Sequence, residues 1–118
     1  MGGDVIGASS STVSGAIKGA ESIGGDALDA VRNTAKGLVK GAGEVGADIG
    51  DVTKGAISGA IGGAKDVGLA VEDAASATAS GAFEAAGAIG QSAVGAVRDV
   101  AASSVDGVKA VIKGDKEG

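Results

Sequence analysis

The stretch GAIGGAKDVGL at residues 59–69 repeats GAIKGAESIGG at residues 15–25, forty-four positions earlier. Division of the chain into blocks of eleven residues from Gly15 gives nine consecutive blocks that reach Lys113 without an insertion. Residues 4–14 fit as a degraded tenth block, and alternate blocks agree best, so the repeating unit has 22 residues. Self-similarity at a fixed period is the sequence signature of a repeat architecture.

The eleven-residue period predicts an α-helix. Eleven residues make three helical turns at about 3.67 residues per turn, close to the relaxed helix, so a pattern with this period stays on one face. Large apolar residues collect at the third and ninth positions of the blocks, and charged residues at the fourth, seventh and eighth, on the opposite face. Strands are disfavoured because no block sustains a two-residue alternation.

We therefore expect an all-α protein made of one long amphipathic helix over residues 14–113, with a helical hairpin bent near Gly62 as the fallback. Residues 1–13 would form a short N-terminal segment, the degraded first repeat, and residues 114–118 a polar C-terminal tail. A strict eleven-residue repeat slightly exceeds about 3.6 residues per turn, so packed helices should form a straight or slightly right-handed coiled-coil oligomer.

The composition leaves little material for a conventional core. The chain has 118 residues, of which 24 are glycine, and Phe83 is its single aromatic residue. The absence of proline favours long helices, and the absence of cysteine and histidine excludes disulfides, the usual zinc sites and histidine acid–base chemistry. A net charge of −5 makes nucleic acid a poor partner.

The glycines predict close contacts between helices. About twenty glycines inside a helix, at roughly 0.5 to 1 kcal/mol each, cost on the order of 10 to 20 kcal/mol relative to alanine, which packing must offset. The pairs Gly15/Gly19, Gly37/Gly41 and Gly59/Gly63 repeat the four-residue spacing of small-xxx-small interfaces. The predicted helix-packing interface comprises Ala20, Ala42, Ala64, Ala86, Gly24, Gly46, Gly68 and Gly90, together with Ile17, Ile23, Val39, Val45, Ile61, Val67, Phe83 and Ile89.

Motifs that resemble chemistry are better explained by the repeat. GAGEVG at residues 41–46 matches the dinucleotide fingerprint G-x-G-x-x-G, but that motif requires a preceding strand and a helix start, whereas these glycines lie within predicted helix. Glu72 takes a third position, and we interpret it as a carboxylate at the solvated margin of the apolar arc. We predict no catalytic, cofactor-binding or metal-binding residues, no cofactor and no small-molecule substrate, so the protein is not expected to be an enzyme.

No targeting or membrane-spanning segment is expected. The N-terminal stretch MGGDVIGASSS lacks the basic region of a signal peptide. Residues 74–97 come nearest to a membrane span, with Glu84 as their one charged residue, but they are rich in Ala, Gly and Ser rather than Leu or Ile. We expect a cytoplasmic or membrane-associated protein.

The unbroken eleven-residue blocks resemble the Gly/Ala-rich hendecad coiled coils of bacterial proteins. They are more weakly similar to late-embryogenesis-abundant proteins, synucleins and exchangeable apolipoproteins. The first resemblance implies a homo-oligomeric α-helical coiled coil, associated in some members with membranes. We therefore expect a self-assembling structural protein whose partner is another copy of itself, with a lipid membrane as a second candidate partner. The alternative is a lipid-surface or stress-protective amphipathic helix that is disordered when free.

Overall fold

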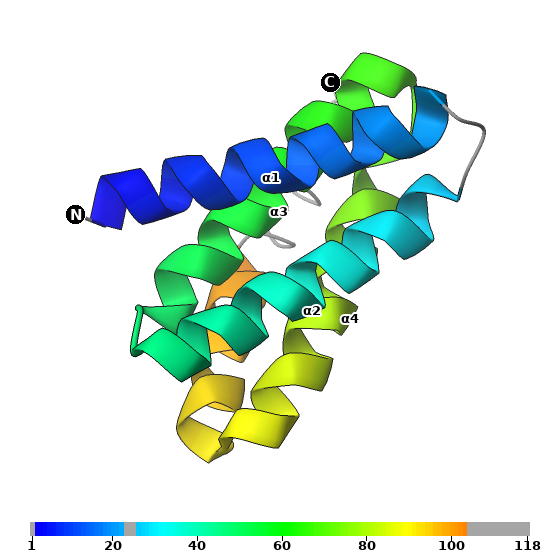
Figure 1. The fold of residues 1–118 in the computed structure, drawn as a ribbon. Coiled ribbons are helices and arrows are strands. Elements are labelled where there is room, and N and C mark those ends of the chain that lie inside the picture. Colours follow the sequence, from blue (N-terminus) through cyan, green and yellow to red (C-terminus); the bar gives the residue numbers. More distant parts are fainter. Residues whose placement is uncertain (1, 23–25, 104–118) are drawn as a thin grey trace, which may run out of the picture.

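The described part of the chain consists of helices joined by very short loops (Figure 1). The computed structural model describes residues 2–22 and 26–103. Its helices are α1 (Gly2–Ser22), α2 (Ala27–Val45), α3 (Ile49–Val67) and α4 (Val71–Ile89), followed by a helical segment over residues 91–103. No strand occurs in these residues, so the all-α prediction is confirmed.

The 22-residue repeat is one helix plus its loop. Helices α2, α3 and α4 each have 19 residues, and their first residues, Ala27, Ile49 and Val71, are spaced by one repeat. Three residues connect α2 to α3, and three connect α3 to α4. Consecutive helices are consequently antiparallel and each repeat reverses the direction of the chain (Figure 1).

Glycines at the tenth position of alternate blocks end the helices. Gly46 has φ 74° and Gly68 has φ 79°, both in the left-handed region, where a residue with a Cβ is strained by roughly 1 to 2 kcal/mol. The amide of Ala47 then donates to the Ala42 carbonyl oxygen at 2.9 Å, and the amide of Leu69 donates to that of Ala64 at the same distance. This six-to-one hydrogen bond is the Schellman motif, which satisfies carbonyls that the helix end leaves unpaired.

Aspartates start the next helices two residues after these glycine positions. The Asp26 and Asp48 side chains accept hydrogen bonds from the backbone amides of Asp29 and Asp51, each at 3.1 Å. A carboxylate there satisfies an unpaired amide and favours the positive end of the helix dipole. In α4 the equivalent residue is Ala70, which makes no side-chain cap.

The prediction of one uninterrupted helix over residues 14–113 is wrong. The chain turns back at residues 46–48 and again at 68–70, whereas Gly62, the position of the predicted hairpin bend, lies inside α3. The apolar phase continues across the turns because each helix and its loop together span two blocks of eleven. The unbroken phase therefore reflects units of equal length and not a continuous helix.

The predicted start of the repeat helix lies inside a longer helix. Residue 14, where the repeat helix was expected to begin, lies inside α1, and the degraded first block at residues 4–14 is helical throughout. The boundary at residue 113 and the tail at 114–118 lie outside the described residues.

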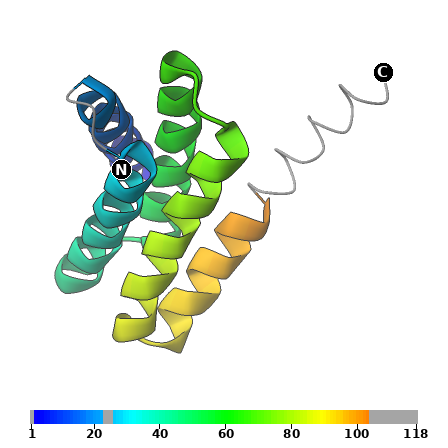
Figure 2. The same cartoon turned by 90° about the vertical axis from the view of Figure 1, so that its right-hand side faces the viewer.

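The helices stack in layers (Figure 2). Helices α1 and α2 form the first layer, α3 and α4 the second, and the segment 91–103 lies on the far side of the second. The most extensive packing joins α1 to α3 and α2 to α4, so each helix mainly contacts the helix two places along the chain. This arrangement of antiparallel helices in successive layers is similar to an α-solenoid.

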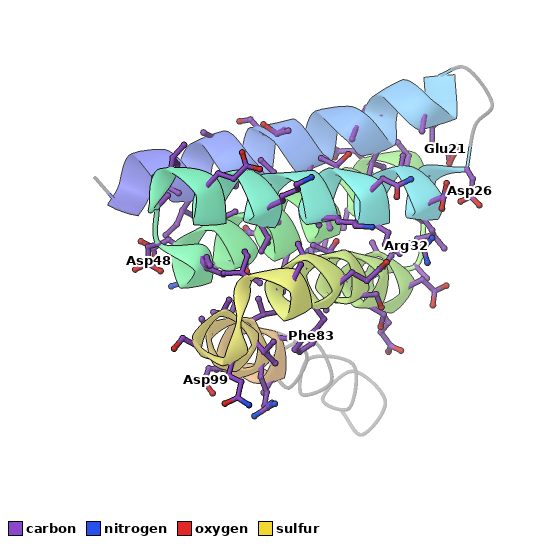
Figure 3. The ribbon with its side chains drawn as sticks, turned by 60° about the horizontal axis from the view of Figure 1, so that its bottom comes forward. Glu21, Asp26, Arg32, Asp48, Phe83 and Asp99 are labelled. Atoms are coloured by element: carbon purple, nitrogen blue, oxygen red, sulfur yellow. The ribbon has the colours of Figure 1, made fainter. Side chains whose placement is uncertain are left out.

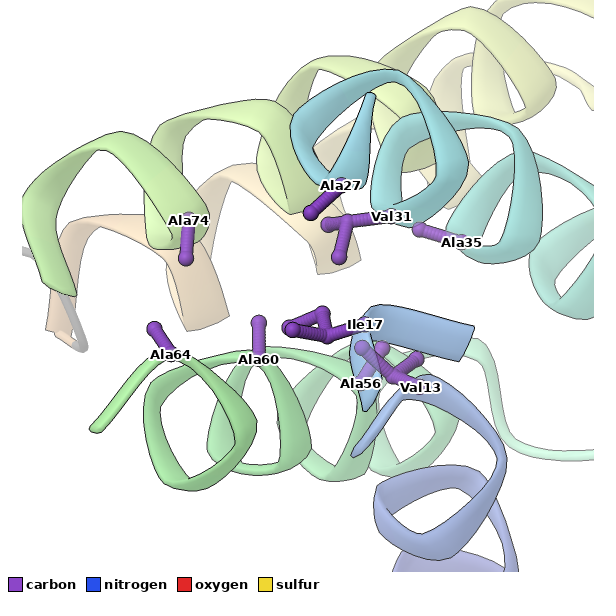
Figure 4. Packing of buried hydrophobic residues seen from close by; sticks show 9 residues of the cluster. All are labelled: Val13, Ile17, Ala27, Val31, Ala35, Ala56, Ala60, Ala64 and Ala74. Atoms are coloured by element: carbon purple, nitrogen blue, oxygen red, sulfur yellow. The ribbon is translucent and has the colours of Figure 1, made fainter. Parts of the chain in front are cut away.

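The core consists mostly of alanine. One cluster joins all four helices through Val13 and Ile17 of α1, three residues of α2, three of α3 and Ala74 of α4 (Figure 4). Alanine and glycine allow the helix axes to approach closely, which is how so few bulky residues can exclude water. Charged residues such as Glu21, Asp48 and Asp99 point outward (Figure 3).

Candidate functional site

The tightest contact in the protein joins α1 to a row of glycines on α3. A Cβ built at Gly59 would overlap the carbonyl group of Ser10, with the Ser10 Cα only 2.8 Å away. A Cβ at Gly55 would lie 2.9 Å from the Ile6 Cα, and one at Gly63 would lie 3.2 Å from the Ser14 Cα. These approaches are made by backbone atoms, which cannot rotate away as the end of a side chain can. Gly55 and Gly59 are therefore required for α1 and α3 to meet.

The same contact recurs one repeat later, between α2 and α4. A Cβ at Gly81 would overlap the carbonyl oxygen of Arg32, with the Arg32 Cα 3.2 Å away. Both pairs, Ser10 with Gly59 and Arg32 with Gly81, are separated by 49 positions in the chain. Because the contacting residue numbers rise together along both helices, α1 runs parallel to α3 and α2 runs parallel to α4.

The equivalent glycines of α1 and α2 are exposed. Gly15 and Gly37 take the repeat position of Gly59 and Gly81, and Gly19 and Gly41 take that of Gly63. No described residue lies within 4 Å of a Cβ built at any of these four glycines. The glycines with small-xxx-small spacing therefore form a surface that α1 covers on α3 and that no described residue covers on α1 and α2.

The predicted interface residues divide into four groups, of which the fourth lies at helix ends. Five are buried in contacts between helices of the same chain: Ile17, Val39, Ala42, Ala64 and Ala86. Ala20, Ile61, Val67 and Phe83 are half-buried at the edges of the core. Ile23 and Gly24 lie outside the described residues.

The remaining predicted interface residues lie at helix ends. Gly46, Gly68 and Gly90 are exposed and have positive φ, with no described residue within 4 Å of a Cβ, so they terminate helices instead of packing between them. Val45, next to the Gly46 cap, is 79% exposed, and Ile89, next to Gly90, is 42% exposed. The helix end carries Val45 out of the core, whereas the partly exposed Ile89 side chain lies against Gly43 of α2.

The predicted interface did not include the residues at the tenth position of the even blocks. Ala35, Ile57, Ala79 and Ala101 take this position, and all four are buried. The first four odd blocks carry glycine at the tenth position and the even blocks carry alanine or isoleucine, which is a visible signal. The alternation separates the helix ends from the helix middles.

Polar groups in the structure are paired locally. The hydroxyls of the buried Thr53 and Thr78 donate to the carbonyl oxygens of Ile49 and Ala74, at 2.8 and 2.7 Å. In the described residues no buried side-chain polar atom lacks a partner, and no group of three or more acidic side chains could hold a metal ion.

Ion pairs lie at the surface where helices cross. Lys18 of α1 pairs with Asp66 of α3 at 3.0 Å, and Arg32 and Lys36 of α2 both approach Glu84 of α4 at 3.8 Å. All five side chains are about half-exposed, so solvent screens each pair and it contributes little to stability. The pairs join the same helices as the glycine contacts, α1 with α3 and α2 with α4.

The dinucleotide-like motif has no phosphate-binding geometry. Gly41 and Gly43 lie inside α2 and Gly46 ends it, so the motif occupies a helix C-terminus, where carbonyl groups and negative dipole charge would repel a phosphate. Glu72 is exposed in the first turn of α4.

No described helix is long and apolar enough to cross a membrane. No protein-family model, curated protein or solved structure matches the chain.

Proposed function

We propose that this protein is a structural protein that assembles with copies of itself through its small-residue helix faces. The proposal depends on the first position of the odd blocks, whose glycines are covered by another helix in some repeats and exposed in others. Its glycines are in backbone contact on α3 and α4, and the same position is open on α1 and α2. Because each exposed glycine costs roughly 0.5 to 1 kcal/mol of helix stability, a contact outside the single chain would compensate that cost.

The interchain contact is expected to have the geometry of the intrachain one. Parallel helices in close backbone contact also describe a coiled coil built on small residues, so the predicted coiled-coil oligomer remains a proposal for the packing between chains. The compact helical bundle would then be the building block of the oligomer, in place of a single long helix.

A lipid surface is the less favoured partner. The apolar arc of each helix is already covered by neighbouring helices, and the core residues Val13, Ile17 and Val31 are fully buried. Lipid would have to separate the helices before it could reach that arc. Association of folded units requires no such opening.

Two measurements distinguish the proposals. For self-assembly, sedimentation velocity across a hundredfold range of protein concentration should show the mean mass rising, while circular dichroism shows the helical signal unchanged on addition of anionic phosphatidylserine vesicles. A constant monomer mass, with helicity that appears only with the vesicles, would instead support the lipid-surface alternative.

A further inference from the structure

A shallow hollow of about 400 Å³ lies between α4 and the helical segment 91–103. It is lined by Ser76, Ala79, Ser80, Phe83, Arg98, Ala101 and Ala102. Its rim residues Ser76 and Ser80 are exposed, whereas Ala79 and Ala101 at its base are buried. The hollow is thus a groove between two helices with a floor of small residues.

Every residue of this groove lies three repeats, or 66 positions, after a residue of α1 or α2. The counterparts are Ser10, Val13, Ser14, Ile17, Arg32, Ala35 and Lys36. Serine corresponds to serine at both rim positions, Arg98 to Arg32, and Ala101 to Ala35. The groove therefore repeats the surface that α1 and α2 present to the rest of the bundle.

In the α1/α2 copy of this surface, α3 covers the α1 residues, whereas Arg32 and Lys36 of α2 face α4. Gly59 of α3 lies on the backbone of Ser10, and Gly63 lies against Ser14 and the Ile17 side chain. Ala56, Ala60 and Ala64 of α3 complete one core with Val13, Ile17 and Ala35. A helix that presents glycines four residues apart, followed by alanines, is thus the shape that this surface accepts.

Helix α1 carries the same pattern, with its glycines on an exposed face and Ala20 half-buried against the core of its own chain. Gly15 and Gly19 lie 44 positions before Gly59 and Gly63, and Ala16 and Ala20 lie 44 positions before Ala60 and Ala64. Gly15 and Gly19 have no described residue within 4 Å of a built Cβ. Among residues 2–22 and 26–103, nothing fills the groove or covers Gly15 and Gly19 of α1.

We propose that α1 of a second copy docks in the groove between α4 and the segment 91–103, as α3 docks on α1 and α2 within one chain. This inference rests on the proposed self-assembly and names its interface. The contact joins two different surfaces, so it continues the 22-residue repeat from one molecule to the next. A heterologous contact of this kind yields an open chain of molecules.

The test blocks each surface separately. Gly15→Leu adds a side chain to the α1 face at a point with free space in the monomer, and Gly62→Leu, at an equally open glycine of α3, is its matched control. Ser80→Trp covers the groove, where the indole can pack on Phe83. If circular dichroism shows that Ser80→Trp is not folded, Ala102→Trp is used in its place.

Sedimentation velocity then reads the association. We expect the wild type and Gly62→Leu to form species whose mean mass keeps rising with concentration. We expect Gly15→Leu alone and Ser80→Trp alone to associate at least tenfold more weakly. An equimolar mixture of these two variants should give a complex of two chains and no larger species, because each supplies the surface that the other lacks.

The other outcomes distinguish failure of self-assembly from failure of the groove as its interface. A wild type that stays monomeric would overturn the proposed self-assembly itself. If the wild type associates and the two blocked variants associate equally well, self-assembly stands, but the groove is not its interface, and residues 104–118 of the same chain become the candidate occupant. If both variants are weakened and the mixture yields no two-chain complex, the head-to-tail contact is overturned in favour of a symmetric one.

Discussion

The carbonyl oxygen of Arg32 lies where the side chain of residue 81 would begin, so only glycine at position 81 lets α2 and α4 meet. The relationship is the same as that of Ser10 and Gly59 one repeat earlier. Two identical contacts at the same separation show that the repeat encodes a packing step, in which each helix docks in parallel on the helix two places before it. Gly59 and Gly81 are therefore parts of helix interfaces, whereas Gly46 and Gly68 end helices.

Gly59→Ala should destabilise the bundle. The added methyl group would overlap the backbone of Ser10, and the two helices would have to move apart, which costs about 1 to 3 kcal/mol as overpacking does elsewhere. The control is Gly62→Ala in the same helix, where the methyl group meets no described residue and should stabilise by about 0.4 to 1 kcal/mol. Urea unfolding followed by circular dichroism measures both, and equal effects of the two substitutions would contradict the close contact.

Gly46→Ala should destabilise for a different reason. The residue has φ 74°, and alanine there is strained by roughly 1 to 2 kcal/mol although nothing lies nearby. Gly41→Ala, at an exposed position inside α2, should instead raise stability by about 0.5 to 1 kcal/mol through helix propensity. Thermal unfolding of the two variants compares them directly. A stabilised Gly46→Ala variant would mean that α2 continues through residue 46, as the single-helix prediction required.

Helical structure could be predicted from the sequence, but the path of the chain could not be read from the same pattern. The eleven-residue period fixes which side of each helix is apolar, and Ile17, Val39 and Ala64 are buried accordingly. The period does not show where the turns lie, because one helix and its loop together fill two blocks of eleven and leave the period unchanged. The local signals for turns were glycine at the tenth position of odd blocks and aspartate two residues later, as at Gly46 and Asp48.

Which glycines make contacts could be predicted only in part from the sequence. Gly15, Gly37 and Gly59 take the same place in the repeat, yet only Gly59 is in backbone contact. Which copy is covered depends on the order of the helices in the stack, and a single repeat unit carries no information about that order. The pairing of helices two places apart emerges only from the three-dimensional arrangement.

Ala64→Leu should affect folding as well as association. Sequence reasoning placed Ala64 between chains, and the structure buries it completely inside one chain, next to Ala60 and Ala74. Three extra carbons at a closed position cost about 1 to 3 kcal/mol. We expect a lower midpoint of urea unfolding at protein concentrations where the wild type is monomeric. If the midpoint is unchanged there and only the association weakens, Ala64 lies between chains and the bundle packs differently.

Ala70→Asp should stabilise the protein, because the repeat supplies an aspartate at this place in the two preceding units. Asp26 and Asp48 each accept a hydrogen bond from the amide three residues on, whereas Ala70 leaves the equivalent amide of Asp73 without a side-chain cap. Ala70 has φ −65° and ψ 124°, close to the extended backbone of Asp48, so an aspartate needs no rearrangement to reach that amide. A new N-cap of this kind contributes about 0.5 to 2 kcal/mol.

The nearby acidic residues Glu72 and Asp73 repel an added carboxylate, so Ala70→Ser, which caps without charge, is the matched variant. Thermal unfolding should place both variants above the wild type, and Ala70→Asp should gain further as salt screens the repulsion. If neither variant is stabilised, α4 does not begin at residue 71, and the three-residue loop at 68–70 is wrong.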